Sequence, residues 1–583
     1  MSRTAIMIGI LAACAATEIP AARGDPAAPD LRFGLMTHFA QGWDPSWIQP
    51  VAAAHIATVR DEIYWDSVEP RRGTFAFPPA DDAFMAGLKR EGISPLVVLD
   101  FANPGYDRGQ TPWTEAGIAA YARYAAAVLQ HYGPQIQAVE IWNEYNGTFC
   151  TGPAASHRAA TYLRMLRAAY AEIKRVRPDV TVVGGATAGI PLPYWTELLE
   201  GGVLDCLDVV SVHPYRYDGP PEGLEDDING LRQLMRRIGG RAKPVWVTEI
   251  GWDTRGSQVS GGHAVDDATL ARYLVRAYAL LLSAGVERVY WYELRDEKDG
   301  PAMGLVRSDA ARTPKPAYRA LASLVRQLDG ARCVRREPSA EGIYSILFQR
   351  PSGEQVRVLW ALQPALIAAS GSIAITDLAG RRVDAGAELN LSDSPLFVTG
   401  DFSGLPPAPP QTETVLADSR RDFSSMQGAN GWYYGSHRGP AGLGFSPLPS
   451  YAVTDWSAEW KGELPFISVS DRDQHPSVAG SVPVAAVRRW VSTRAGEVHV
   501  TGSFHCGTQG DGVGVSVLVD GRPLFRELLG GGRHPVERKF DFVQQVGPGT
   551  AIDFAVDPGP GNDISYDVTD FSATIRSTQE EHF

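Results

Sequence analysis

Between residues 31 and 328 the chain alternates short apolar runs with longer amphipathic segments, and this alternation most constrains its fold. Strand-like runs lie at 33–37, 58–61, 95–101, 138–142, 181–185, 209–213, 245–249 and 289–292. Helical periodicity fills several of the gaps, most clearly at 114–132, 155–177 and 267–284. Eight such units in one domain of this size predict an α/β fold, a closed (β/α)8 TIM barrel.

A doubly wound parallel sheet is the rival fold for the same alternation. That fold usually has fewer strands, and in dinucleotide-binding proteins a Gly-x-Gly-x-x-Gly turn follows its first strand. No such turn follows residues 33–37, so the barrel is favoured.

Beyond residue 328 the pattern changes to short strands with alternating polarity. Residues 329–404 predict a small β-sandwich packed on the barrel. The proline-rich residues 405–411 predict a stiff linker. Residues 412–577 are rich in glycine and β-formers and predict a jelly-roll β-sandwich.

The N-terminal residues 1–24 are typical of an export signal. Arg3 supplies a positive charge, and the apolar run that follows is too short to span a bilayer. Leu11-Ala12-Ala13-Cys14 resembles a lipobox, which would place a lipid anchor on Cys14. Cleavage by a general signal peptidase is the second route and is slightly favoured. We expect an exported bacterial protein: periplasmic, secreted or an outer-membrane lipoprotein.

Composition narrows the partners and cofactors. The net charge of −13 argues against nucleic acid, whose phosphates require a basic face. The 14 tryptophans favour a carbohydrate ligand, because sugar rings stack on indole rings. None of the five cysteines forms a Cys-x-x-Cys pair, so a zinc site is unsupported and isolated thiols are expected. We expect no cofactor, no metal at the active site, no transmembrane span, and a monomer.

Two carboxylates stand at the ends of predicted strands. Asn143 and Glu144 follow the run 138–142, and Glu249 ends the run 245–249. The carboxyl ends of barrel strands build the active site, and strands four and seven lie on opposite sides of its mouth. The two carboxylates therefore suit the cleavage of a glycosidic bond between them. The candidate residues read off at these strand ends are His38, Arg60, Trp65, Asn143, Glu144, His213, Tyr215, Glu249, Trp252, Trp291 and Glu293.

The ordered motifs of this region resemble clan A retaining glycoside hydrolases, most closely family 39 and related bacterial exopolysaccharide endoglycosidases. In chain order the motifs are VRDEIYW at 59–65 with VEP at 68–70, IWNE at 141–144, VHPY at 212–215, WVTEIGW at 246–252, YWY at 290–292 and KPAY at 315–318. The resemblance implies that Glu144 is the acid/base and Glu249 the nucleophile. Many clan members carry proline after this glutamate, whereas Tyr145 follows it here.

The resemblance also implies roles for the residues around the two carboxylates. Arg60 would keep Glu249 ionised, and Tyr215 would donate its hydroxyl to it. Trp291 would form the floor of the subsite that holds the sugar being cleaved. His213 could bind a carboxylate or equally be a core residue. The full expected substrate-binding set is Asn143, Arg60, His213, Tyr215, Trp291, His38, Trp65 and Trp252.

The C-terminal sandwich resembles carbohydrate-binding modules of the galactose-binding-like type. Its candidate contacts are Trp432, Tyr433 and Tyr434. The 471–475 turn is either a ligand loop or plain surface, and structural support of the barrel is an alternative role for the domain. The expected function is retaining hydrolysis of a poly- or oligosaccharide through a covalent glycosyl-enzyme. A non-catalytic polysaccharide-binding surface protein and a transglycosylase are the alternatives.

Overall fold

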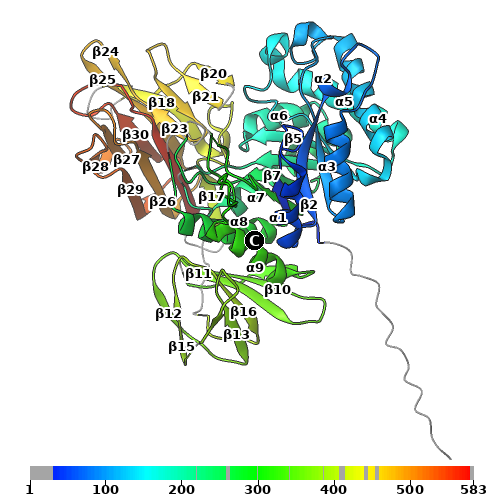
Figure 1. The fold of residues 1–583 in the computed structure, drawn as a ribbon. Coiled ribbons are helices and arrows are strands. Elements are labelled where there is room, and N and C mark those ends of the chain that lie inside the picture. Colours follow the sequence, from blue (N-terminus) through cyan, green and yellow to red (C-terminus); the bar gives the residue numbers. More distant parts are fainter. Residues whose placement is uncertain are drawn as a thin grey trace, which may run out of the picture.

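The structure is a computed structural model (Figure 1). It describes residues 30–577 apart from 218, 258–262, 299, 341, 385, 406–413, 439–443 and 454–457. The predicted export signal with Cys14, and all of the predicted linker after Leu405, lie outside the described residues. In the described part of the chain, no helix is both long enough and apolar enough to cross a bilayer.

Eight parallel strands close into a barrel in chain order, because β8 pairs with β1. They are β1 (Phe33–Met36), β2 (Thr58–Tyr64), β3 (Ser94–Asp100), β4 (Ala138–Ile141), β5 (Thr181–Ala188), β6 (Val209–His213), β7 (Val245–Ile250) and β8 (Arg288–Trp291). Closure removes both sheet edges and excludes the doubly wound alternative. The predicted (β/α)8 barrel is confirmed.

Helices cover the outside of the barrel. They are α1 (Ile48–Ala53), α2 (Trp65–Val68), α3 (Pro79–Arg90), α4 (Glu115–Tyr132), α5 (Arg158–Val176), α6 (Leu192–Glu200), α7 (Leu224–Gly239), α8 (Asp267–Ser283) and α9 (Pro316–Leu328). Helix α7 shows why they pack here. Its buried residues Leu224, Ile228, Leu231 and Met235 recur at helical spacing and form one apolar stripe.

The inside of the barrel holds a separate apolar layer with one residue from each of six strands. Its members are Leu96, Ala138, Val183, Val209, Trp246 and Tyr290. Alternate residues of a strand face the same side of the sheet, so this layer fixes which later residues point to the barrel axis. Strand pairing then becomes irregular between Val247 and Ile250, next to the predicted nucleophile.

A small sandwich follows α9. Its strands are β9 (Arg332–Arg336), β10 (Ile343–Gln349), β11 (Gln355–Ala361), β12 (Ala365–Ala368), β13 (Ile373–Thr376), β14 (Arg382–Val383), β15 (Glu388–Leu391) and β16 (Leu396–Gly400). Six of them form one sheet, and β12 pairs with β15. Phe348 and Trp360 join the apolar core of the barrel, and Trp360 donates to Glu222 over 3.0 Å. One face of this sheet therefore packs on the barrel and shares its apolar core.

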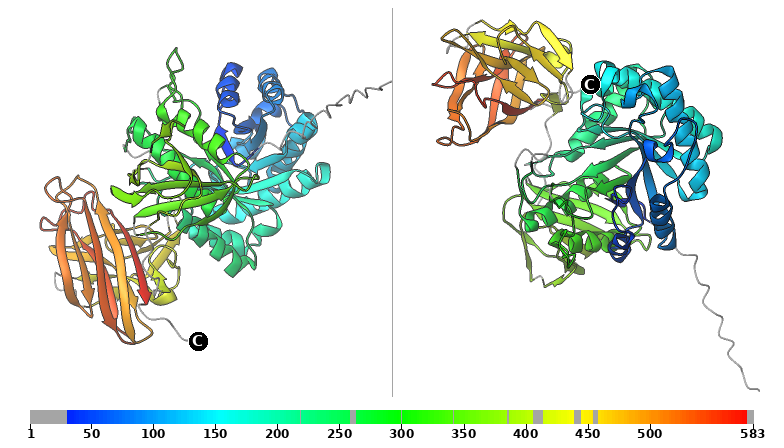
Figure 2. Two further views of the ribbon diagram at one scale, coloured as in Figure 1. Left: turned by 90° about the horizontal axis from the view of Figure 1, so that it is seen from below. Right: turned by 45° about the horizontal axis from the view of Figure 1, so that its top comes forward.

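The C-terminal sandwich consists of two antiparallel sheets beside the barrel (Figures 1 and 2). Its strands are β17 (Thr414–Asp418), β18 (Trp432–Arg438), β19 (Ser446–Pro447), β20 (Ser450–Val453), β21 (Ala458–Lys461), β22 (Ser468–Ser470), β23 (Asp473–His475), β24 (Ser477–Ala479), β25 (Val482–Val491), β26 (Gly496–Cys506), β27 (Val513–Val519), β28 (Arg522–Leu529), β29 (Glu537–Val546), β30 (Ala551–Asp557) and β31 (Thr569–Ser577). Trp432 and Tyr434 are completely buried between the sheets. Both are core residues and not the sugar contacts expected from the sequence.

Candidate active site

The two predicted catalytic carboxylates meet at the carboxyl end of the barrel. Glu144 lies just after β4, and Glu249 lies near the end of β7. Nδ1 of His213 is 3.0 Å from Oε1 of Glu144 and 3.8 Å from Oε2 of Glu249. One carboxylate oxygen of Glu144 and one of Glu249 lie within 4.8 Å of each other. A single sugar ring could therefore contact both carboxylates.

The backbone that carries Glu144 adopts an uncommon conformation. Trp142 has φ 67° and Glu144 has φ 44°, both in the left-handed region that residues with a β-carbon disfavour. Hydrogen bonds hold it there: the Glu144 amide donates to the Ala186 carbonyl over 2.9 Å, and the Gly147 amide donates to the Glu144 carbonyl over 2.8 Å. Such strain persists only where the surroundings fix it, and it concentrates at functional sites.

Arg60 connects three polar groups beneath the site. Its Nε donates to Glu140 over 2.6 Å, its Nη1 to Glu249 over 2.6 Å and its Nη2 to Asn143 over 2.9 Å. The side chain is 1% exposed. Because Asn143 accepts through its amide oxygen, its amide nitrogen is left to donate to a ligand.

Glu249 is held in its ionised form. The Tyr215 hydroxyl donates to Oε2 over 2.8 Å, opposite the contact from Arg60. Burial by itself raises the pKa of the Glu249 carboxyl, but the charges of His213 and Arg60 and the Tyr215 hydrogen bond outweigh it. The pKa of Glu249 therefore lies below its ordinary value, and the carboxylate is available as a nucleophile.

His213 joins the two carboxylates and is completely buried. Its Nε2 lies 3.0 Å from the Thr248 hydroxyl, and its Nδ1 faces Glu144. Burial by itself lowers the pKa of His213, but the charge of Glu249 and the hydrogen bond to Glu144 raise it above its ordinary value. Of the two roles left open by the sequence, the structure places His213 against the carboxylates.

A second polar group lies further round the mouth. His38 stands between Glu62 and Glu293, with its ring nitrogens 3.3 Å and 3.4 Å from their carboxylates. Burial lowers the pKa of His38, but the charges of Glu62 and Glu293 raise it to about 9. Burial raises the pKa of Glu293 to about 8. These residues form a buried ion cluster at the site of the predicted His38 contact.

Three predicted aromatic contacts do not reach the cleft. Trp65, Trp252 and Trp291 are completely buried in the barrel core. Tyr290 belongs to the interior layer, so Trp291 points to the outer side and Tyr292 points to the mouth. Tyr292 is half-buried, and its ring contacts those of His38 and Tyr215. The prediction of substrate contact is therefore corrected for the three tryptophans.

Sequence reasoning missed Glu140 and Thr248, which support the site from below. Both lie two residues after interior positions, Ala138 and Trp246 respectively. Strand alternation places them toward the barrel axis. There Glu140 accepts a hydrogen bond from Arg60, and the Thr248 hydroxyl forms a hydrogen bond with His213. A charged residue inside the apolar run 138–142 was the available signal for Glu140.

Glu144, His213 and Glu249 are also a set of donors that could reach a common metal ion. The neighbouring charge opposes such a site, because Arg60 already lies 2.6 Å from Glu249. A second cation at this carboxylate would face the fixed guanidinium at short range. The donor set therefore fits carboxylate chemistry better than metal binding.

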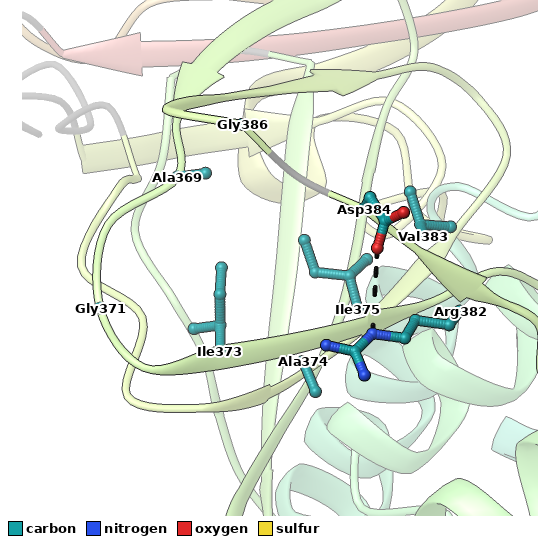
Figure 3. A pocket seen from close by; sticks show the side chains of 9 residues that line it. All are labelled: Ala369, Gly371, Ile373, Ala374, Ile375, Arg382, Val383, Asp384 and Gly386. Carbon is teal, nitrogen blue, oxygen red and sulfur yellow. Dashed lines mark ion pairs between the residues drawn. The ribbon is translucent and has the colours of Figure 1, made fainter.

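A separate hollow of about 210 Å³ lies in the small sandwich (Figure 3). It opens between β13 and β14 and includes Arg382 and Asp384, which are 4.0 Å apart and highly exposed. No residue that lines it belongs to the barrel. The hollow is therefore unrelated to the pair of carboxylates.

Comparison with known proteins identifies the barrel. Residues 117–315, which include both Glu144 and Glu249, match the family model described as glycosyl hydrolase catalytic core. The barrel is a glycoside hydrolase domain. No curated protein matches the sequence.

Solved glycoside hydrolases are similar to this chain over the barrel to different degrees. A family 39 glycoside hydrolase from the gut symbiont Bacteroides cellulosilyticus WH2 is 24% identical, with a TM-score of 0.56, over 64% of this chain and 81% of that one. A family 39 β-xylosidase from Caulobacter crescentus is 16% identical, with a TM-score of 0.46, over 65% and 97% of the two chains. The first of these likenesses supports the barrel architecture of the hydrolase domain.

Proposed function

We propose that this glycoside hydrolase retains anomeric configuration and cleaves O-glycosidic bonds of a poly- or oligosaccharide by double displacement. The unequal setting of the two carboxylates carries the proposal. Glu249 is 7% exposed and accepts from Arg60 and Tyr215. The Glu144 side chain is 19% exposed, and its one side-chain hydrogen bond among the described residues is with His213. A fixed ionised carboxylate suits the nucleophile, and a more accessible one suits the acid/base.

The separation of the carboxylates supports retention over inversion. Carboxyl groups stand about 5–5.5 Å apart in retaining enzymes and roughly 6.5–9.5 Å apart in inverting ones, which need room for a water molecule. Here one oxygen of Glu144 lies within 4.8 Å of one oxygen of Glu249. This short approach favours the closely spaced arrangement of retaining enzymes.

Each step of the reaction has a residue that performs it. Glu249 attacks the anomeric carbon while the bond to the leaving oxygen breaks, and Glu144 gives its proton to that oxygen. In the second step Glu144 takes a proton from water, whose oxygen attacks the same carbon and releases Glu249. Asn143, fixed by Arg60, donates its amide to a hydroxyl of the reacting sugar.

Hydrolysis and transglycosylation differ only in the acceptor of the second step. Both use the same carboxylates, so product analysis separates them. A panel of bacterial and plant polysaccharides, with the products mapped by mass spectrometry, identifies the substrate and shows whether cleavage is internal or terminal.

The test of the proposal replaces each carboxylate. Glu249→Ala and Glu144→Gln are expected to lower kcat by at least a factor of 1,000 while each variant keeps its fold, an order of magnitude typical for groups of this kind. Glu115→Gln is the matched control, because that carboxylate is 87% exposed at the start of α4. Turnover near the wild-type value in either active-site variant would refute the assignment. NMR of the first product is expected to show the anomer of the substrate.

We also propose that the protein is exported. The support is the basic and apolar pattern of residues 1–24, which lie outside the described residues. Mass spectrometry of the mature N-terminus distinguishes a lipid-modified Cys14 from cleavage by a general signal peptidase. Recovery of the intact N-terminus would contradict the proposal.

A further inference from the structure

The C-terminal sandwich places one arginine beside the active site. Arg472 lies in the turn between β22 and β23, within the 471–475 segment whose role the sequence left open. Its Nη2 lies 3.3 Å from the position that a β-carbon would occupy on Gly189. Gly189 follows β5, and its amide donates to the carbonyl of His213 over 2.9 Å. The guanidinium therefore lies against Gly189, which hydrogen-bonds to the backbone of His213, the histidine that contacts both carboxylates.

The guanidinium of Arg472 is available to a ligand. Arg472 is exposed, and its backbone amide donates to the Ser470 hydroxyl. Its guanidinium forms no hydrogen bond or ion pair in the described part of the chain. Among the nearby acids, the neighbouring Asp471 has the largest effect on the pKa of Arg472, but it forms no ion pair with it in the described part of the chain. Asp227 pairs with Arg216 over 2.8 Å, and Asp570 pairs with Arg420 over 2.8 Å. An arginine offers five N–H donors in a planar fork that fits vicinal oxygens.

An exposed aromatic ring lies in the loop between β6 and α7. Tyr217 is 37% exposed and stacks on Tyr215, with the ring centroids 5.9 Å apart and the planes 15° apart. Arg472 and Glu144 both influence its phenol electrostatically, and Glu144 does so more strongly than Glu249. Arg472 lies on the Glu144 side of the cleft, because Gly189 follows β5 and the Glu144 amide donates to the carbonyl of Ala186 on β5 over 2.9 Å. The leaving group would be protonated on this side.

We propose that Tyr217 and Arg472 form a leaving-group subsite, so that the C-terminal sandwich completes the cleft of the barrel. The sugar next to the cleaved bond would lie along the Tyr217 ring, and Arg472 would donate to its oxygen atoms. Those acceptors are either vicinal hydroxyls of a neutral sugar or the carboxylate of a uronic acid. The inference rests on the proposed glycosidase function and extends it to a second domain.

The sandwich is held in place for this role by other contacts with the barrel. The side chain of Arg421 lies 3.9 Å from the β-carbon position of Gly230 in α7. Burial is the main cause that raises the pKa of Tyr451 on β20, and the charges of Asp471 and of Glu197 on α6 add to it. Both observations concern the α6–α7 side of the barrel, and α7 follows the loop that carries Tyr217.

The test compares two substrates in Arg472→Ala, Arg472→Lys and the control Arg522→Ala. Arg522 is exposed on β28, at the far edge of the other sheet. One substrate is an oligosaccharide that the wild type cleaves, and the other is an aryl glycoside, whose leaving group lacks a sugar. In Arg472→Ala the ratio of kcat/KM for the oligosaccharide to that for the aryl glycoside is expected to fall about tenfold, the loss typical of one hydrogen bond from a charged group. Arg522→Ala leaves the ratio unchanged.

Two further measurements separate the outcomes. Calorimetric binding of neutral and uronate-containing oligosaccharides to Glu249→Ala, with and without Arg472→Ala, needs no turnover. A loss of affinity with the uronate series alone identifies a carboxylate ligand, and a loss with the neutral series identifies hydroxyls. Unchanged affinity in both series, at unchanged melting temperature, overturns the subsite. Absence of all turnover in the wild type would instead contradict the proposed glycosidase function.

Discussion

The hydrogen bond from Tyr215 to Glu249 gives a quantitative prediction for the substitution Tyr215→Phe. The hydroxyl donates over 2.8 Å to a carboxylate that is 7% exposed. A hydrogen bond to a charged group contributes about 1.5–3 kcal/mol. The phenyl ring keeps the shape of the side chain, so the main loss is the stabilisation of ionised Glu249.

This loss shifts the pH profile in a defined direction. Because the bond favours the carboxylate, its removal raises the pKa of Glu249, and one pH unit corresponds to about 1.4 kcal/mol. The acid limb of kcat/KM is expected to move about one to two units to higher pH. The assay is the pH dependence of kcat/KM with an activated aryl glycoside. Tyr170→Phe is the control, because that hydroxyl contacts Asp208 on the outside of the barrel. An acid limb that stays in place or moves to lower pH would refute the reasoning.

Two further predictions concern stability. Arg60→Met leaves Glu140 and Glu249 without their buried counter-charge. The free energy of unfolding, measured by urea denaturation at pH 7, should therefore fall by about 3–5 kcal/mol. A loss below about 1 kcal/mol would contradict the central role of these two ion pairs. His213 has a raised pKa in the folded protein, so the stability from its protonation is complete below the unfolded pKa of about 6.5 and is lost as pH rises through the folded pKa. His213→Gln should therefore destabilise the protein most at low pH, and melting curves showing a larger loss at high pH would contradict this sign.

The barrel was predictable because its signal is repeated along the sequence. Each apolar run recurs at a spacing that only a closed or doubly wound parallel sheet accommodates, and the strand ends then locate the site. Glu144 and Glu249 were found in this way, since each follows a buried run directly. The contact of Arg60 with Glu249 was implied by the resemblance to clan A hydrolases, and the two side chains lie 2.6 Å apart.

The direction in which side chains point within the strands was harder to predict from the sequence. Trp291 and Tyr292 are neighbours, and only the identity of the interior layer shows that the tyrosine faces the mouth. The same information was needed for Glu140 and Thr248. The contribution of Arg472 depends on how two domains pack, and no local pattern in the sequence encodes that packing.

The roles assigned to the two carboxylates are tested most directly by azide rescue of Glu249→Ala and Glu144→Ala with an activated aryl glycoside. Azide can replace the missing nucleophile in the first variant and attack the glycosyl-enzyme in the second. We therefore expect a glycosyl azide of inverted configuration from Glu249→Ala and one of retained configuration from Glu144→Ala. The opposite assignment of the two products, or rescue of neither variant, would contradict the account.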